Sequence, residues 1–245
     1  MAGQSTIEWT NKTWNPTTGC TKVSPGCKNC YAERFAHRLL HMHSVRYQEG
    51  FKLALHNDVL ELPLKGKRPS LIFVNSMSDL FHEAIPDDFI RKTFQIMNEA
   101  HWHSFQILTK RSARLKELAN TLSWTTNIWI GVSVESYQYY FRINDLQAVP
   151  ASVLFISAEP LLSDLPGLPL ENIHWVIVGG ESGPGSRPVL SAWVENVLAQ
   201  CRHRNVPFFF KQWGGTFKKR NGRLLNGMEY NERPICRSHA AELLG

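Results

Sequence analysis

Three of the five cysteines of this sequence lie close together near its beginning. Cys20 is followed by six residues, Cys27, two residues and Cys30. A Cys-x2-Cys pair places two thiolates on one tight turn, and Cys20 reaches the same place across a loop. Thiolates are the ligands of iron–sulfur clusters and of soft zinc sites. Because there are three cysteines rather than four, the spacing predicts a metal centre with one coordination position left for a ligand.

Other histidines and cysteines are weaker candidates for this centre. His37 follows the last of the three cysteines by seven residues and could complete a zinc site. The helix predicted between them, however, carries it nearly two turns away. We therefore expect His37, His41 and His43 on a solvent-exposed helix face. Cys201 lies on an apolar helical face and is predicted to be a core residue, while Cys236 falls in an irregular tail and has no assigned role.

The composition indicates one folded protein with reduced thiols. At 245 residues, 43% of them hydrophobic, the chain is long enough for one sizeable α/β domain. No apolar stretch reaches the length of a membrane helix, and the first residues lack the apolar centre of a signal peptide. We therefore expect a soluble cytoplasmic protein with no membrane partner and no disulfides in the cluster. The net charge of +6 is compatible with a polyanionic partner and equally with a mildly basic solvated surface.

The elements that must position these cysteines repeat a pattern of apolar run, polar loop and helical segment. Six runs are predicted to begin with strands: 71–75, 104–110, 127–136, 152–162, 174–188 and 206–215. Pro86 opens one of the intervening helices, and Ser191 is predicted to cap another. Near-continuous apolar strands that alternate with helices are typical of a parallel sheet covered on both faces. The pattern predicts an α/β fold, a partial (β/α)6-type barrel with parallel strands and an N-terminal cysteine loop; a Rossmann-like open sheet is the alternative.

The C-terminal segment differs from this pattern. Asn221-Gly222 lies between two extended runs and predicts a tight hairpin. The basic residues of "TFKKRNGRLL" would project from it, either as a solvated turn or as a contact to phosphates. We therefore predict a barrel in residues 1–215, which includes the cysteine loop, and a small C-terminal hairpin extension in residues 216–245, packed on the barrel.

Polar residues and glycines follow the predicted strands where they end. They are Ser76, Ser78, Asp79, Lys110, Ser133, Glu135, Glu159, Gly179, Gly180, Glu181, Arg187 and Lys211. The carboxyl ends of parallel strands share one edge of the sheet, and in α/β folds that edge holds the active site. Any one of these residues could be a helix cap or part of a salt bridge, but together they predict a ligand site. The cysteine loop should face this rim, above all Asp79, Glu135, Glu159 and Glu181.

The strings around these residues resemble a known family. "EWTNKTWNPTTGCTKVSPGCKNCYAERFAHR", "SMSDLFHE", "SAEPLL", "GGESGPGSRP" and "FKQWG" are similar to the phage Gp37/Gp68-type (three-Cys-motif, DUF5131) family of unknown function. Three cysteines in a loop after a strand-like segment, followed by a helix and further β/α units, resemble the radical S-adenosylmethionine (radical SAM) superfamily. That superfamily usually has Cys-x3-Cys-x2-Cys, so the six-residue gap in this sequence implies a longer cysteine loop.

The superfamily resemblance implies a chemistry and its ligands. It implies a [4Fe–4S] cluster held by Cys20, Cys27 and Cys30, an open iron that binds S-adenosyl-L-methionine, and an electron donor protein as partner. The rim residues suited to bind that cofactor are Ser76, Ser78, Asp79, Ser133, Glu135, Glu159, Gly179, Gly180 and Glu181. The residues suited to face an anionic substrate, such as a nucleotide phosphate, are Lys110, Arg187 and Lys211.

Two classes of function follow. The first is a radical SAM-like enzyme that reductively cleaves S-adenosylmethionine and abstracts hydrogen from a nucleic acid, a nucleotide or a related molecule, in modification or repair. The second is a non-catalytic zinc or iron–sulfur protein that binds nucleic acid through its basic surface. The polar rim favours the enzyme, because a protein that only binds does not need such a rim.

Overall fold

The structure, a computed structural model, describes residues 3–5 and 7–234, and its centre is one sheet of eight strands. In sheet order these are β1 (Gly3–Gln4), β2 (Lys12–Trp14), β5 (Leu71–Val74), β6 (Ser104–Thr109), β7 (Ile128–Ser133), β8 (Val153–Ala158), β9 (Trp175–Gly179) and β10 (Phe208–Gln212). The seven strands from β2 to β10 are parallel, and β1 pairs antiparallel with β2. The sheet curls into a half-barrel, which confirms the predicted partial barrel. Its parallel strands follow one another in chain order, without the reversal of a Rossmann-like sheet.

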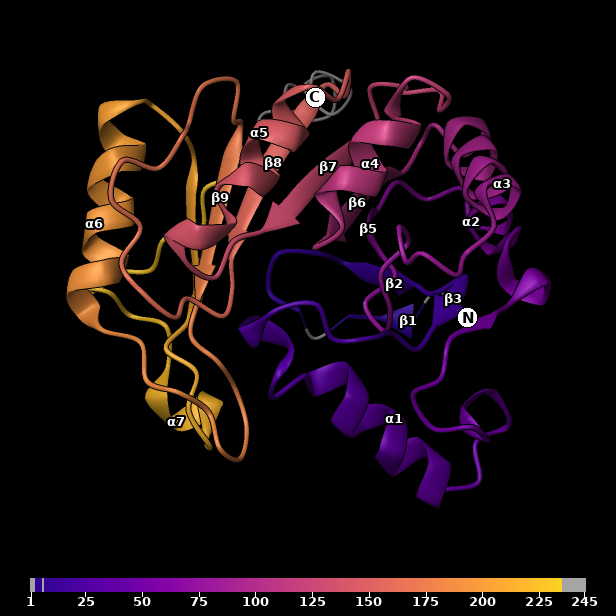
Figure 1. The fold of residues 1–245 in the computed structure, drawn as a ribbon, viewed down its shortest axis with the longest axis horizontal. Coiled ribbons are helices and arrows are strands. Elements are labelled where there is room, and N and C mark those ends of the chain that lie inside the picture. The colour runs from indigo at the N-terminus through magenta and orange to yellow at the C-terminus, as the bar shows by residue number, and fades with distance from the viewer. Residues whose placement is uncertain (1–2, 6, 235–245) are drawn as a thin grey trace.

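Helices cover the outside of this sheet. Figure 1 shows them in an arc: α3 (Asp87–Glu99), α4 (Ser112–Ala119), α5 (Phe141–Gln147) and α6 (Ser191–His203). The helix α1 (Tyr31–His41) lies apart from them, across the open side of the half-barrel. The remaining elements are short: β3 (Thr17–Thr18), β4 (Ala54–Leu55), α2 (Leu62–Lys65), α7 (Lys218–Asn221) and the 3-10 turns η1 (Pro25–Cys27), η2 (Val45–Tyr47), η3 (Asn57–Val59) and η4 (Tyr137–Tyr139).

The two faces of the sheet have different cores because side chains alternate along each strand. Ile130 on β7 and its outward-facing neighbours join the aliphatic core under the helices. Trp129, one residue earlier, belongs to a smaller aromatic cluster inside the half-barrel, with Phe155, Trp175 and other residues. This alternation determines which residue at each strand end faces inward, and therefore which can reach a ligand held inside the half-barrel.

Two local predictions were wrong. Leu190 is the N-cap of α6, and Ser191 lies inside the helix, where its hydroxyl donates to Glu195 at 2.7 Å. No hairpin turn forms at Asn221-Gly222, because the preceding residues form the helix α7. The tight turn is the next Asn-Gly pair, 226–227, whose two residues both have positive φ, between the bridged Leu225 and Met228. Positive φ at both central residues is typical of a type I′ turn.

The chain after α7 returns to the sheet. The backbone N–H of Phe210 on β10 donates to the carbonyl of Tyr230 at 3.0 Å, and the indole of Trp175 on β9 donates to the carbonyl of Glu232 at 2.7 Å. Residues 235–245, which include Cys236, lie outside the described residues. Within the described part of the chain, no helix is both long enough and apolar enough to cross a membrane.

Candidate functional site

A cavity of about 380 Å³ lies where the parallel strands end. Inward-facing residues of the strands and of the positions just after them line one part of it: Leu108, Lys110, Ser133, Ser157, Glu159 and Lys211. The cysteine loop and the start of α1 line another part, with Gly26, Cys27, Asn29, Cys30 and Tyr31. Residues two apart on a regular strand share a face, so Ser157 on β8 points to the same side of the sheet as Phe155 of the aromatic cluster. The cavity therefore opens from the inside of the half-barrel.

Aromatic side chains line the cavity next to this inner cluster. Trp9 and Phe73 are both buried members of the cluster and both line the cavity, with their ring centroids 4.6 Å apart. Ile7 and Leu108 add further apolar surface. An apolar wall combined with a few polar groups is typical of small-molecule sites, and flat rings are suited to stack on a heteroaromatic base.

The three cysteines of the loop have free thiols and are half-buried. Cys27 ends η1, and Cys30 is the N-cap of α1. These two line the cavity, whereas the Sγ of Cys20 accepts a hydrogen bond from Arg111 Nη1 at 3.4 Å. Burial raises the pKa of Cys20 to about 11, and the nearby carboxylate of Asp79 adds to the increase.

The chemistry of this donor set fits a metal centre held by three thiolates. Three soft ligands lie on one loop, and two of them open onto a cavity that could hold a further ligand. Within residues 3–5 and 7–234, no three His, Cys, Asp or Glu side chains are grouped around a position for one metal ion. The histidines that could have completed a zinc site are exposed along α1 or just after it: His37, His41 and His43. The donor set therefore consists of three thiols, one fewer than a four-ligand zinc ion requires.

Asp79 holds the beginning of the cysteine loop through Arg111. Its Oδ2 accepts hydrogen bonds from Arg111 Nη1 at 3.2 Å and from the Lys110 backbone N–H at 3.0 Å, and its Oδ1 accepts from the Thr109 hydroxyl at 2.7 Å. The buried guanidinium also donates to the carbonyl and hydroxyl oxygens of Thr21, at 3.1 and 2.9 Å. Both carboxylate oxygens are engaged, and the residue does not line the cavity, so its geometry supports holding the loop rather than the predicted cofactor contact.

Glu135 holds the middle of the loop. Its Oε2 accepts a hydrogen bond from Arg142 Nη1 at 2.9 Å, and its Oε1 accepts one from the hydroxyl of Ser24. The side chains of Glu135 and Arg142 are 0% and 2% exposed. Gly26 passes so close that a Cβ there would lie 2.7 Å from Glu135 Oε1. The carboxylate is therefore enclosed between the loop and α5 rather than directed at a ligand.

Glu181 holds the end of the loop. Its Oε2 accepts hydrogen bonds from Asn29 Nδ2 and from the backbone N–H of Arg187, each at 2.9 Å. Arg187 also forms an ion pair with this carboxylate and donates from Nη2 to the carbonyl of Pro25 at 2.9 Å. Burial opposes ionisation of Glu181, but the hydrogen bonds from Arg187 and Asn29 outweigh it and lower the pKa to about 2. Arg187, predicted to face substrate, is thus engaged between Glu181 and the loop.

The glycine-rich turn after β9 is approached by a side chain of this chain itself. Arg34 on α1 donates to the carbonyls of Ser182 at 2.5 Å and Pro184 at 3.2 Å. Gly183 has φ +98°, and a Cβ there would lie 2.4 Å from Arg34 Nη2. The sequence predicted that this turn lets a ligand approach the backbone, but at Gly183 the group that approaches is Arg34.

Glu181 also lines the cavity, but its oxygens are engaged by Asn29 and Arg187, which leaves Glu159 as the cavity carboxylate that is not held to the cysteine loop. The Oε1 of Glu159 is 2.7 Å from Lys211 Nζ, and both side chains are partly exposed, at 20% and 13%. Lys110 also lines the cavity and takes part in no ion pair within the described residues. These three residues are therefore the predicted charged groups that are available to a ligand.

The remaining predicted residues also divide into those that line the cavity and those that do not. Ser133 and Gly180 line the cavity. Ser78 instead donates to the carbonyl of Thr17 at 2.9 Å, and Ser76 donates to Asn15 Oδ1 at 3.2 Å, so both hold the segment before the cysteine loop. Gly179 does not line the cavity; a Cβ at this position would lie 3.3 Å from the Glu159 carboxyl carbon.

Sequence reasoning missed residues that act through distant contacts. Trp9 and Phe73 line the cavity, and the alternation of β5 could have assigned Phe73 to the inner face. Arg142 and Asn29 had no such signal. Their roles depend on partners that only the folded chain brings near them.

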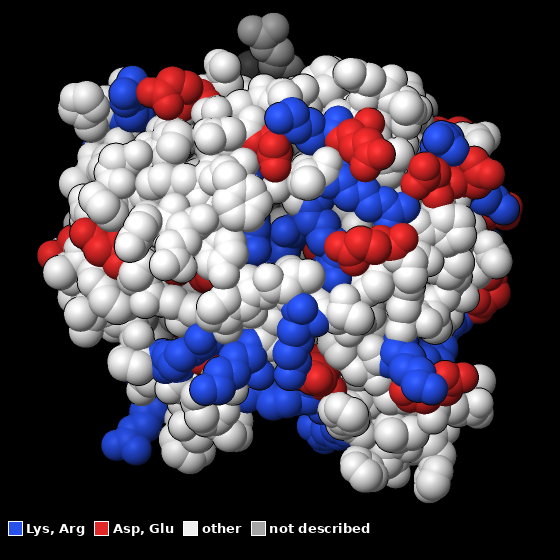
Figure 2. Space-filling model, viewed as in Figure 1, with Lys and Arg blue, Asp and Glu red and all other residues white. Residues whose placement is uncertain are grey.

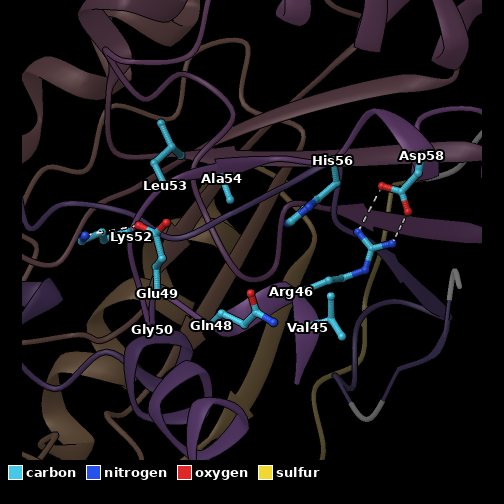
Figure 3. A pocket seen from close by; sticks show the side chains of 10 residues that line it. All are labelled: Val45, Arg46, Gln48, Glu49, Gly50, Lys52, Leu53, Ala54, His56 and Asp58. Carbon is cyan, nitrogen blue, oxygen red and sulfur yellow. Dashed lines mark hydrogen bonds and ion pairs between the residues drawn. The ribbon is translucent and has the colours of Figure 1, made fainter. Parts of the chain in front are cut away.

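A second hollow, of about 520 Å³, lies on the segment from η2 to η3 (Figure 3). Its charged side chains pair with one another: Arg46 with Asp58, and Lys52 with Glu49 at 3.2 Å. It contains no cysteine and none of the predicted site residues. The cavity at the strand ends is therefore the candidate site.

Comparison with known proteins agrees with this fold. The model of one protein family, described as "Protein of unknown function (DUF5131)", matches residues 4–234. No match was found among curated proteins. A solved spore photoproduct lyase, complexed with dinucleoside spore photoproduct, has a TM-score of 0.50 and 11% identity and covers 73% of this chain and 58% of its own. A double mutant of spore photoproduct lyase, with bound AdoMet and the dinucleoside, has a TM-score of 0.49 and 10% identity and covers 69% of this chain and 56% of its own.

The chain therefore spans less than two thirds of the length of either lyase. At such low identity, the likeness of the first lyase shows a shared half-barrel fold. The family match is broader, because it covers almost every described residue. This chain belongs to the DUF5131 family.

Proposed function

We propose that this protein is a radical SAM-like iron–sulfur enzyme acting on a nucleotide or nucleic acid. The observation that carries the proposal is that Cys27 and Cys30 open onto the same cavity as the Glu159–Lys211 pair and the wall of Trp9 and Phe73. A bound [4Fe–4S] cluster and S-adenosylmethionine would supply the reductive cleavage of the cofactor and the hydrogen abstraction from substrate. We also keep the phage Gp37/Gp68-type assignment as a proposal, based on the sequence strings alone.

The chain's own residues would hold and orient these groups. Cys20, Cys27 and Cys30 would bind the cluster, and the tethers from Asp79, Glu135 and Glu181 would fix the loop that carries them. Ser133, Glu159 and Gly180 line the cavity and would contact S-adenosylmethionine, since a carboxylate accepts from an ammonium or from ribose hydroxyls. The apolar wall would exclude water from the reacting groups.

The same cavity suits a substrate that is both anionic and aromatic. Lys110 and Lys211 supply positive charge, while Trp9 and Phe73 supply rings on which a base could stack. The spore photoproduct lyase that shares the fold is complexed with a dinucleoside, and we transfer that ligand class to this chain only as part of the proposal. An electron donor protein would be a further partner.

The second candidate is a non-catalytic metalloprotein that binds nucleic acid. It is favoured by one observation: three rim carboxylates, Asp79, Glu135 and Glu181, hold the cysteine loop through hydrogen bonds. Such tethers would equally support a metal centre whose only role is to join the loop to the half-barrel.

Anaerobic reconstitution with iron and sulfide, followed by dithionite and S-adenosylmethionine, distinguishes the two candidates. The enzyme should release 5′-deoxyadenosine, and Cys27→Ala should abolish this release. Cys201→Ala is the matched control, because it removes a buried cysteine outside the loop. A protein that takes up stoichiometric zinc, shows no iron absorbance and leaves S-adenosylmethionine intact would contradict the enzyme and favour the second candidate.

A further inference from the structure

We propose that a single-stranded polynucleotide binds across the mouth of the cavity, along two surfaces that we call the α1 face and the α7 finger. The α1 face consists of Tyr31, Phe35 and Arg38, and the α7 finger of Phe217, Lys219 and Arg220. This inference deepens the proposed function by naming a polymer as the substrate class. It rests on the proposed function for the reaction that the strand would undergo, but the binding of the strand is argued independently of that function.

Both surfaces begin at the cavity itself. Tyr31, the first residue of α1, and Lys218, the first residue of α7, line it. Figure 1 shows α1 and α7 apart from each other, below the sheet. A chain that crosses from one to the other would pass the mouth of the cavity and could place one nucleotide inside it.

Positive charge on the two surfaces is not neutralised locally. Arg38, Lys219 and Arg220 are exposed, and none of them takes part in an ion pair within the described residues. Lys218 differs, because it pairs with Glu8 at 3.1 Å. Figure 2 shows lysine and arginine side chains gathered over α7 and α1 in the lower part of the molecule, with few acidic ones among them. Exposed cations of this kind attract phosphates.

Exposed aromatic rings accompany these cations. Phe217 is 69% exposed, Tyr31 51% and Phe35 46%. α1 buries Ala32 and Ala36 and leaves the face that carries Tyr31 and Phe35 open. Arg38 continues this face, because residues seven apart are two turns apart on the same side of a helix. Rings next to cations suit unpaired bases joined by phosphates, since each base can stack on a ring.

Other anions would use only part of this arrangement. A mononucleotide could fill the cavity but would leave Lys219, Arg220 and Phe217 without a partner. An acidic peptide would engage the cations but has no row of aromatic bases for the rings. A paired duplex presents its phosphates and keeps its bases stacked inside. The single strand is the ligand that uses both kinds of side chain.

The test is fluorescence anisotropy of labelled oligo(dT) and oligo(U) at several salt concentrations, with the full chain and no added S-adenosylmethionine. We expect either strand to bind at least tenfold more tightly than the duplex of the same length, polyglutamate or a mononucleotide. Lys219→Ala with Arg220→Ala should reduce the salt slope by about 1.4, because each contact to a single strand contributes about 0.7. Phe217→Ala should weaken binding about fivefold or more at an unchanged slope.

The matched control is Lys65→Ala with Lys92→Ala, which makes the same change in net charge at exposed positions elsewhere. An equal loss of binding in this control, or an unchanged slope in the α7 double variant, would overturn the proposal. So would equal affinity for a mononucleotide or for duplex. If the reconstituted protein releases 5′-deoxyadenosine but no single strand binds, this inference fails and the proposed function stands. If strands bind as expected and no 5′-deoxyadenosine forms, the proposed function fails and this inference stands.

Discussion

The ion pairs Glu135–Arg142 and Glu159–Lys211 follow the carboxyl ends of neighbouring strands, β7 and β8, but only the second faces the cavity. The first is buried against the cysteine loop, where its carboxylate also accepts from Ser24. The second is partly exposed. The same residue type in the same place along two adjacent strands therefore has two roles: one carboxylate holds the loop, and the other is available to a ligand.

Removing the cation of the buried pair should have the largest effect on stability. Arg142→Ala leaves a carboxylate that is 0% exposed without its counter-ion. We expect the free energy of unfolding to fall by about 3–5 kcal/mol, measured by urea denaturation. The double variant Arg142→Met with Glu135→Gln should recover part of this loss, because it removes both charges. A loss below about 1 kcal/mol in Arg142→Ala would show that the two pairs do not differ as described.

Loosening the contacts that Arg111 makes with Cys20 and Thr21 should have the next largest effect. Arg111→Lys keeps the charge beside Asp79 but loses the forked donor that reaches both Cys20 and Thr21. If the loop holds a cluster, we expect a chelator to remove iron about 10–100 times faster, in proportion to the metal affinity that is lost when groups supporting the ligands are removed. Arg91→Lys on α3 is the control, since it changes an arginine that pairs only with exposed carboxylates. Equal rates in both variants would argue against the tether.

Acid should weaken the tether at Glu181. Its pKa is about 2 in the folded protein, against an ordinary value of 4.5, so the unfolded chain binds the proton first. The stabilisation is therefore complete above pH 4.5 and is lost as the pH falls towards 2. We expect Glu181 to account for about 1–2 kcal/mol of the fall in unfolding free energy over this interval, after allowance for solvent screening. Glu181→Gln should remove that part of the pH dependence, and an unchanged profile would contradict the assignment.

Removing the cation of the cavity pair should have the smallest effect on stability. Lys211→Ala leaves Glu159 with access to solvent, so the free energy of unfolding should change by less than about 1 kcal/mol in urea denaturation. If the residue faces a ligand, the same variant should still weaken oligonucleotide binding. A stability loss as large as that of Arg142→Ala would mean that Lys211 belongs to the scaffold.

Much of the fold could be predicted because it depends on local pattern. Each of the six strands predicted from apolar runs is present, as β5 to β10. Continuous apolar runs between polar loops are typical of buried parallel strands. The helix after Pro86 was predicted from its apolar spacing and is α3. The errors at Ser191 and Asn221 each concern one turn. The helix cap is the neighbouring Leu190, and the Asn-Gly turn forms at the second Asn-Gly pair rather than at the first.

The candidate site was predictable in place but not in detail. Every strand-end residue was assigned to one rim, and the structure places the cysteine loop against that rim. What each carboxylate contacts could not be predicted, because its partner comes from elsewhere in the chain. Asn29 is 152 positions from Glu181, and Lys211 is 52 positions from Glu159.

The sequence by itself determined the parallel α/β architecture, the loop with three clustered thiols and the polar residues at the strand ends, because these depend on residue type and spacing. Only the tertiary structure decided that Asp79, Glu135 and Glu181 hold the loop while Glu159 faces the cavity. The physical reason is that a buried charge takes the nearest counter-ion or hydrogen-bond donor. Which donor is nearest depends on the curl of the sheet and on how α1 and the cysteine loop close over it.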